Sequence, residues 1–133
     1  MTRQRVFRGV VASGRGLAEP VMSTPAIQKA LANLTGLSMV PGTLNVVLRD
    51  AFKEKLPVYV PVKELGGLPG VPNRKGLRLG AVIIAGRFNG IVFQGDEPEY
   101  PPNHVELISD HKLRAELNLA DGDAIEFTMV RDR

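Results

Sequence analysis

The sequence predicts a mainly β domain, in which about seven short strands and two short helices form a compact barrel. Short apolar segments are separated by turns rich in Gly and Pro. Only two segments space their apolar residues as a helix does, and strands and helices do not alternate regularly, which argues against a doubly wound sheet. The 133 residues contain no repeat and suffice for one core, so we expect a single domain spanning 1–133.

The N-terminal half is expected to contain a strand, a helix and a second strand. Residues 6–12 are apolar and predict the first strand. Thr24 and Pro25 are typical of a helix N-cap and first helical position, and Gly36 suits the left-handed residue that follows a helix. A loop then leads to the second strand at 43–49.

The C-terminal half contains the remaining predicted elements. Residues 58–62 include Pro61, which favours an edge strand because proline cannot donate to a central ladder. Strands at 77–85 and 90–94 are predicted to form a hairpin through Asn89 and Gly90, a strong turn pair. The last elements are a strand at 104–108, a helix at 110–117 capped by Ser109 or Asp110, and a strand at 124–130.

The composition excludes several classes of function. There is no Cys, which excludes disulfides, thiolate metal sites and a Cys nucleophile. No apolar run is long enough to span a bilayer, and no signal-peptide core follows the basic N-terminus, so we expect a cytoplasmic protein without a membrane partner. The net charge of +3 suits an anionic ligand, whereas the absence of Trp and scarcity of Phe and Tyr disfavour a base-stacking platform.

A tight turn at Pro41 and Gly42 leads directly into an apolar strand, and its first residues include Thr43 and Asn45. In a strand, residues two apart point to the same face, so these two oxygen-bearing side chains converge while Leu44 faces a core. Neutral oxygen ligands suit a hard cation such as Mg2+, which takes further ligands from phosphates. The alternative is that Thr43 and Asn45 only cap a strand-entry turn.

Three blocks, at 13–16, 41–48 and 105–123, occur in an order that resembles the archaeal CTP-dependent riboflavin kinases over nearly the whole chain. The resemblance implies a cradle-loop β-barrel, related to the swapped-hairpin barrels, with six to seven strands. It also implies Mg2+-dependent phosphoryl transfer from CTP to the 5′-hydroxyl of riboflavin, which gives FMN and CDP.

The same resemblance implies roles for particular residues. Thr43 and Asn45 bind Mg2+, and Glu106 contacts the flavin and is the candidate catalytic residue, either holding the ribityl hydroxyl or acting as its base. The implied nucleotide-binding residues are Gly14, Arg15, Gly16, Leu17, Lys112, Leu113, Arg114 and Ala115. These residue types suit the chemistry, because glycine lets backbone N–H groups approach phosphates and cationic side chains neutralise their charge.

Each of these residues also has a purely structural interpretation. Gly14 and Gly16 are alternatively turn glycines. Lys112 and Arg114 are alternatively solvated helix residues, with Arg114 paired to Asp110 or Glu116, and Glu106 an exposed strand residue. His104 and His111 have the spacing of neither a paired metal site nor a triad, and we assign both to surface or capping roles.

Two other functions remain open. Residues 17–20 and the acidic segment 95–99 depart from the family pattern, which motivates a catalytically inactive nucleotide- or flavin-binding barrel. The basic chain also admits a DNA-binding swapped-hairpin protein, although the Thr43 and Asn45 motif and the Gly-rich segment would then have no purpose. We expect the kinase, acting as a monomer on CTP and riboflavin without a nucleic-acid partner.

Overall fold

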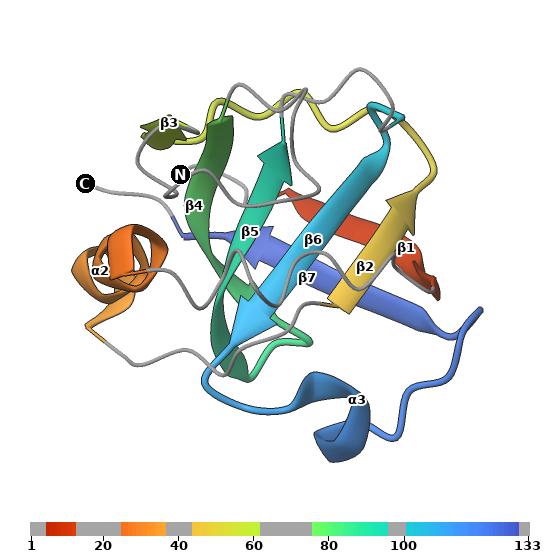
Figure 1. Cartoon of the computed structure of the whole chain (residues 1–133). Coiled ribbons are helices and arrows are strands. Elements are labelled where there is room, and N and C mark those ends of the chain that lie inside the picture. Colours follow the sequence, from red (N-terminus) through yellow and green to blue (C-terminus); the bar gives the residue numbers. More distant parts are fainter. Residues whose placement is uncertain (1–4, 13–24, 37–43, 62–75, 96–100, 131–133) are drawn as a thin grey trace.

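The computed structural model describes residues 5–12, 25–36, 44–61, 76–95 and 101–130 (Figure 1). Within these residues lie, in chain order, β1 (Val6–Ala12), α2 (Pro25–Thr35), β2 (Leu44–Leu48), β3 (Val58–Pro61), β4 (Gly76–Ile84), β5 (Phe88–Gly95), β6 (His104–Ser109), α3 (Leu113–Glu116) and β7 (Ala124–Met129). Neither helix in this part of the chain is long and apolar enough to cross a bilayer.

The strands form a closed antiparallel barrel with one additional strand. Their order is β3-β4-β5-β6-β2-β1-β7, and β4 also pairs with β7. One edge of β4 is therefore shared: β3 pairs with its first half, as in Val58 opposite Leu79, and β7 pairs with its second half, as in Val82 opposite Met129. This arrangement closes β4, β5, β6, β2, β1 and β7 into a ring. The predicted barrel of six to seven strands is confirmed.

The barrel interior is filled by one apolar cluster that contains four phenylalanines, three of which lie together. Phe7 from β1 stacks on Phe127 from β7 with ring centroids 5.2 Å apart, and Phe52 meets the Phe7 ring edge-on at 5.1 Å. Side chains alternate as predicted in β2, where Leu44 and Val46 point into this cluster. The amide of Asn45 between them therefore lies on the outer face.

A second apolar layer covers the outside of part of the barrel. Helix α2 packs against β3, β4 and β5 (Figure 1), and its Leu31 is fully buried. On β5, Val92 points into the barrel, whereas Ile91 and Phe93 point outward and are nevertheless fully buried. Ile91 and Phe93 are thus shielded from solvent on the outer side of the barrel wall.

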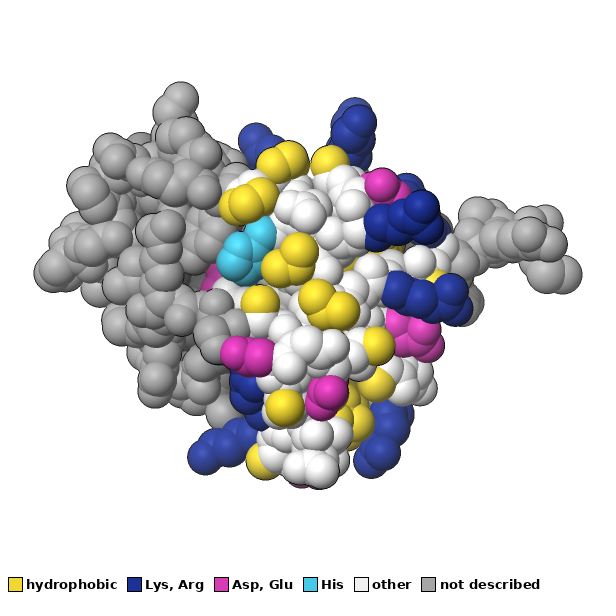
Figure 2. All heavy atoms as spheres, turned by 90° about the vertical axis from the view of Figure 1, so that its right-hand side faces the viewer, with side chains coloured by type: hydrophobic (Ala, Val, Ile, Leu, Met, Phe, Trp, Pro, Cys, Tyr) yellow, Lys and Arg dark blue, Asp and Glu magenta, His cyan; other side chains and the backbone are white. Residues whose placement is uncertain are grey.

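The opposite face of the barrel carries charges of both signs. In Figure 2, Lys and Arg side chains lie beside Asp and Glu, and the apolar side chains form small separate groups. Val6 and Val10 of β1 are 42% and 43% exposed, and Arg8 forms an ion pair of 3.0 Å with Glu126 of β7. The described residues of this face therefore form no continuous basic stripe of the kind that tracks a phosphate backbone.

The hairpin between β4 and β5 turns earlier than predicted. Ala85 and Gly86 have φ angles of +54° and +70°, and the N–H of Arg87 donates to the carbonyl of Ile84 at 3.1 Å. Asn89 and Gly90 belong instead to β5, so the prediction of an Asn-Gly turn was wrong. A Cβ on Gly90 would lie 2.6 Å from the carbonyl oxygen of Ile108, so this glycine permits close strand packing.

The second predicted helix is also shorter than expected. α3 spans one turn, Leu113–Glu116, where 110–117 was predicted. Strand β6 extends to Ser109, whose hydroxyl donates to the carbonyl of Asn89 at 2.8 Å and accepts the N–H of His111 at 3.3 Å. Ser109 thus closes the turn before the helix. A single helical turn has only a weak dipole, so α3 adds little positive potential at its N-terminus.

The remaining sequence assignments fit the described residues. β1 has the predicted bounds, α2 begins at Pro25, Gly36 has a φ of +73°, and β3 is an edge strand that contains Pro61. The second strand is confirmed over Leu44–Leu48. Thr24 and Thr43 lie outside the described residues.

Candidate active site

The candidate site is built on a row of residues that lie opposite one another across four strands. Asn45 of β2 is paired with Glu106 of β6 on one side and with Ala12 of β1 on the other. Glu106 is paired in turn with Phe93 of β5. We call Phe93, Glu106, Asn45 and Ala12 the cross-strand row. The pairing register therefore brings two predicted site residues from distant parts of the sequence into direct apposition.

Both polar members of the row are buried. Asn45 is 8% exposed and Glu106 is 6% exposed. Glu106 lies between Val105 and Leu107, which point into the barrel core, so its carboxylate is on the outer face. The alternative that Glu106 is an ordinary exposed strand residue is therefore wrong. A buried carboxylate lowers the stability of the fold unless polar groups or cations compensate its charge. Buried ionisable groups of this kind are common at sites that bind a ligand.

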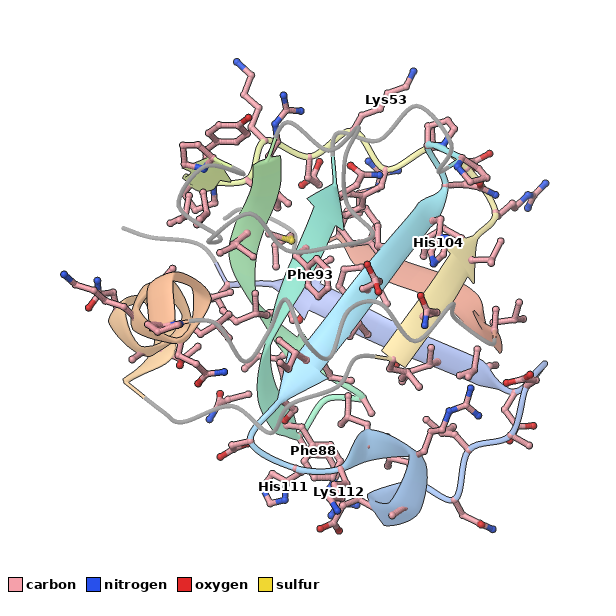
Figure 3. All side chains as sticks on the ribbon, in the orientation of Figure 1. Lys53, Phe88, Phe93, His104, His111 and Lys112 are labelled. Atoms are coloured by element: carbon pink, nitrogen blue, oxygen red, sulfur yellow. The ribbon has the colours of Figure 1, made fainter. Side chains whose placement is uncertain are left out.

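His104 is the residue that sequence reasoning missed. Its Nε2 lies 3.0 Å from Oδ1 of Asn45, and its side chain is half-buried on the same outer face as Glu106 (Figure 3). His104 was assigned to a surface or capping role, and the structure adds this contact with Asn45. The available signal was its position two residues before Glu106, which places both side chains on one face of a strand. The contact with Asn45 depends on the pairing of β2 with β6.

Arg114 lies at the Ala12 end of the row. Its guanidinium donates to the carboxylate of Asp121 at 2.7 Å and to the carbonyl oxygen of Ala12 at 3.3 Å. The structural alternative for Arg114 was an ion pair with Asp110 or Glu116, but its ion-pair partner in the structure is Asp121. The turn that contains Asp121 is held to β1 as well, because the N–H of Gly122 donates to the carbonyl of Val11 at 2.7 Å. Arg114 thus ties the start of α3 to the end of β1.

The other residues of the α3 block differ in exposure. Lys112 and Ala115 are exposed, and the side chain of Lys112 has no hydrogen-bond or ion-pair partner among the described residues. Leu113 is 6% exposed and belongs to the barrel core. The side chain of Leu113 is therefore part of the core, whereas the ammonium of Lys112 is exposed and meets no partner in the described part of the chain.

The other predicted residues lie outside the described part of the chain. Thr43 directly precedes Leu44 at the start of β2, and Gly14, Arg15, Gly16 and Leu17 follow closely after Ala12 at the end of β1. In the sequence, both segments adjoin strands that contribute to the cross-strand row. Among the described residues, no group of three or more His, Asp and Glu is arranged to hold a metal. A cation held by Thr43 and Asn45 would need further ligands from phosphate or water.

A cavity of about 350 Å3 that was not predicted from the sequence is lined in part by Lys53. It lies at the end of the barrel opposite Lys112, as Figure 3 shows. Its walls include both cationic and polar side chains, and its lining residues are Phe52, Lys53, Glu54, Lys55, Leu56, Arg78 and Gln94. Gln94 connects this cavity to the candidate site, because its side-chain amide donates to the backbone carbonyl of His104 at 3.3 Å.

Comparison with known proteins supplies the family. The model of the family CTP-dep_RFKase, described as "Domain of unknown function DUF120", matches residues 11–129. The chain is 32% identical to a riboflavin kinase of Methanocella arvoryzae over 93% of its own length, and 34% identical to one of Pyrobaculum aerophilum over 92%. It spans 56% and 59% of those two proteins. It is also 31% identical to a riboflavin kinase of Aeropyrum pernix and spans 96% of that protein. The chain therefore belongs to the CTP-dep_RFKase family, and the predicted family resemblance is confirmed.

Proposed function

We propose that this chain is a riboflavin kinase that transfers the γ-phosphoryl group of CTP to the 5′-hydroxyl of riboflavin, with Mg2+ as its cofactor. Family membership and the name riboflavin kinase shared by its relatives support the reaction, and the family name supports CTP as donor. The observation that carries the proposal is the cross-strand row. It sets a buried amide against a buried carboxylate, with the cation of Arg114 at one end.

The donor set fits a hard divalent cation. Asn45 offers an amide oxygen and, in this proposal, Thr43 adds its hydroxyl, and both are neutral oxygen ligands of the kind that Mg2+ accepts alongside phosphate and water. When bound, Mg2+ would neutralise charge on the phosphates of the nucleotide. This role does not require a cluster of carboxylates, so it is compatible with the ligand types found at this site.

The remaining residues have complementary roles in the proposal. Glu106 accepts a hydrogen bond from the 5′-hydroxyl of riboflavin, or takes its proton, as that oxygen bonds to the γ-phosphorus and CDP leaves. Lys112 and Arg114 stabilise phosphate charge by hydrogen bonds, together with backbone groups of Leu113 and Ala115. The nucleotide-binding segment that includes Gly14, Arg15, Gly16 and Leu17 completes the phosphate site.

Product formation tests this proposal. The protein is incubated with riboflavin and Mg2+ and, separately, with CTP, ATP, GTP or UTP, and FMN is separated by chromatography. We expect FMN with CTP in preference to the other donors, and loss of the product when Mg2+ is chelated. Asn45→Ala should reduce the rate by a factor of about 100, since removal of one group that stabilises transition-state charge commonly has an effect of this size.

A matched control is available on a neighbouring strand. Asn89 of β5 is exposed, and the hydrogen bond it makes to Ser109 uses its backbone carbonyl, so Asn89→Ala should keep the full rate. Absence of FMN with all four donors, in a protein that is folded and binds CDP, would contradict the kinase and favour the inactive binding barrel.

A further inference from the structure

We infer that His104 is a positioning residue that fixes the side-chain amide of Asn45 for cation binding. This inference rests on the proposed function, in which Asn45 is a ligand of the divalent cation. Its basis is the contact of 3.0 Å between Nε2 of His104 and Oδ1 of Asn45. An amide oxygen can only accept, so the ring N–H of His104 is the donor in this contact.

The backbone of His104 is itself firmly held. Its N–H donates to the carbonyl of Pro101 at 3.0 Å, and its carbonyl accepts the side-chain amide of Gln94 at 3.3 Å. The preceding residue, Asn103, exchanges two hydrogen bonds with Leu48: the Leu48 N–H donates to its carbonyl at 2.8 Å, and its side-chain amide donates to the Leu48 carbonyl at 2.9 Å. The imidazole therefore approaches Asn45 from an anchored strand.

The register also explains why His104 reaches Asn45. His104 is paired with Val47, and Asn45 is paired with Glu106, so His104 and Asn45 are diagonal neighbours on the outer face of β2 and β6. A diagonal neighbour is within reach of a long or ring-bearing side chain. No other residue is needed between them, and the half-buried position of His104 limits competition from water.

The contact has a chemical consequence for Asn45. The terminal torsion of asparagine is broad and roughly two-fold, so the oxygen and nitrogen of a free amide exchange places at little cost. The N–H donor of His104 selects the amide orientation in which Oδ1 of Asn45, and not its NH2 group, faces the imidazole. The carbonyl oxygen has two lone pairs, so it can accept this hydrogen bond and still offer a second lone pair to a cation. Groups that orient a metal ligand in this way typically change metal affinity by a factor of about 10 to 100.

Binding of Mn2+ in the presence of CDP tests this inference without turnover. The free ion is measured by its paramagnetic resonance signal during titration of the full chain. The variants are Asn45→Ala, two changes that remove the donor, His104→Leu and His104→Phe, and one that replaces it, His104→Gln. The glutamine side chain carries an N–H donor of similar reach. Two variants without the donor are used so that a folding defect in one leaves the other to be measured.

We expect Asn45→Ala to abolish saturable Mn2+ binding, the two variants without the donor to weaken it by about 10 to 100-fold, and His104→Gln to restore affinity to within a few-fold of the unchanged protein. Unchanged affinity in His104→Leu or His104→Phe, with binding lost in Asn45→Ala, would overturn the inference and leave the proposed cation site intact. His104→Gln binding as weakly as His104→Leu would also overturn it. Equal binding in Asn45→Ala and the unchanged protein would instead contradict the cation site itself, and the inference with it.

Discussion

The side chains of Asn45 and Glu106 lie directly opposite each other on β2 and β6, and both are almost completely buried. These two residues are 61 positions apart in the numbering, and their strands are neighbours only because the barrel places β2 between β6 and β1. An amide oxygen suited to a cation thus adjoins a carboxylate suited to a hydroxyl. In the proposed reaction, the two groups serve the phosphate donor and the acceptor alcohol respectively.

Substitution Glu106→Gln separates the two roles proposed for the carboxylate. The change keeps the size of the side chain and removes its charge. If Glu106 takes the proton of the 5′-hydroxyl, kcat for FMN formation should fall by a factor of about 100 or more with little change in the KM for riboflavin. If Glu106 only holds the hydroxyl in both ground and transition states, the KM should rise and kcat should remain.

Glu126 of β7 provides the control for that measurement. It is an exposed strand residue paired with Arg8, so Glu126→Gln should leave both kinetic constants unchanged. A Glu106→Gln variant with unaltered kcat and unaltered KM would show that the buried carboxylate takes no part in the reaction.

Substitution Lys112→Ala should weaken nucleotide binding without affecting the fold. The ammonium is exposed and has no partner among the described residues, so its removal breaks no ion pair seen there. Loss of one charge-assisted hydrogen bond to phosphate should raise the KM for CTP by about tenfold, and the melting temperature should be unchanged. Lys29→Ala, at an exposed position on α2, is the matched control. An unchanged KM for CTP in Lys112→Ala would exclude Lys112 from the phosphate site.

Substitutions at Arg114 and Asp121 distinguish structural support from ligand binding. Their side chains are 43% and 52% exposed, so the ion pair contributes only about 0.2–1 kcal/mol to the free energy of unfolding. Asp121→Asn should therefore have a small effect on stability and on the KM for CTP. Arg114→Ala should have a similar effect on stability but a much larger one on the KM. Equal KM values in the two variants would mean that Arg114 acts only by supporting the turn.

The β4–β5 hairpin gives a prediction about stability. Asn89 is an exposed strand residue, so Asn89→Val should change the free energy of unfolding by less than about 0.5 kcal/mol. Gly90→Ala should lower it by about 1–3 kcal/mol, because the added Cβ would lie 2.5 Å from the Ile84 side chain and 2.6 Å from the Ile108 carbonyl oxygen. Both values are measured by urea unfolding. A large loss in Asn89→Val would indicate a turn conformation with positive φ at Asn89, where a β-branched residue is strained.

Local patterns predicted most elements correctly, because they depend on alternation and on residues with restricted backbones. The strand at Val6–Ala12, the helix start at Pro25 and the edge strand containing Pro61 are of this kind. The elements predicted wrongly are those in which contacts with residues distant in sequence outweigh the local preference. The Asn-Gly pair favours a turn locally, yet Gly90 is needed in β5 where the strand packs against Ile108. The helix expected at 110–117 begins only at Leu113, because Ser109 ends β6 and its hydroxyl holds the N–H of His111 in a turn.

In the candidate site, too, individual residues were predicted from local sequence, whereas contacts between distant segments were not. Asn45 and Glu106 were both selected from sequence, one by a spacing of two residues in a strand and the other by family resemblance. Their apposition could not be predicted, since it depends on which strands are neighbours in the barrel. The contact between His104 and Asn45 was missed for the same reason, as it lies on a diagonal across two strands. The hydrogen bond from Arg114 to the carbonyl oxygen of Ala12 was missed for the same reason, because only the folded barrel brings the end of β1 near α3.

The central claim is that the cross-strand row forms the cation–nucleotide site, and paramagnetic broadening tests it most directly. Amide resonances of the 14.4 kDa chain are recorded while Mn2+ and CDP are added. We predict selective loss of the signals of Ala12, Asn45 and Glu106, with the signals of Lys53 and Arg78 at the separate cavity preserved. Broadening centred on Lys53 and Arg78, with the signals of Asn45 and Glu106 unaffected, would contradict the account.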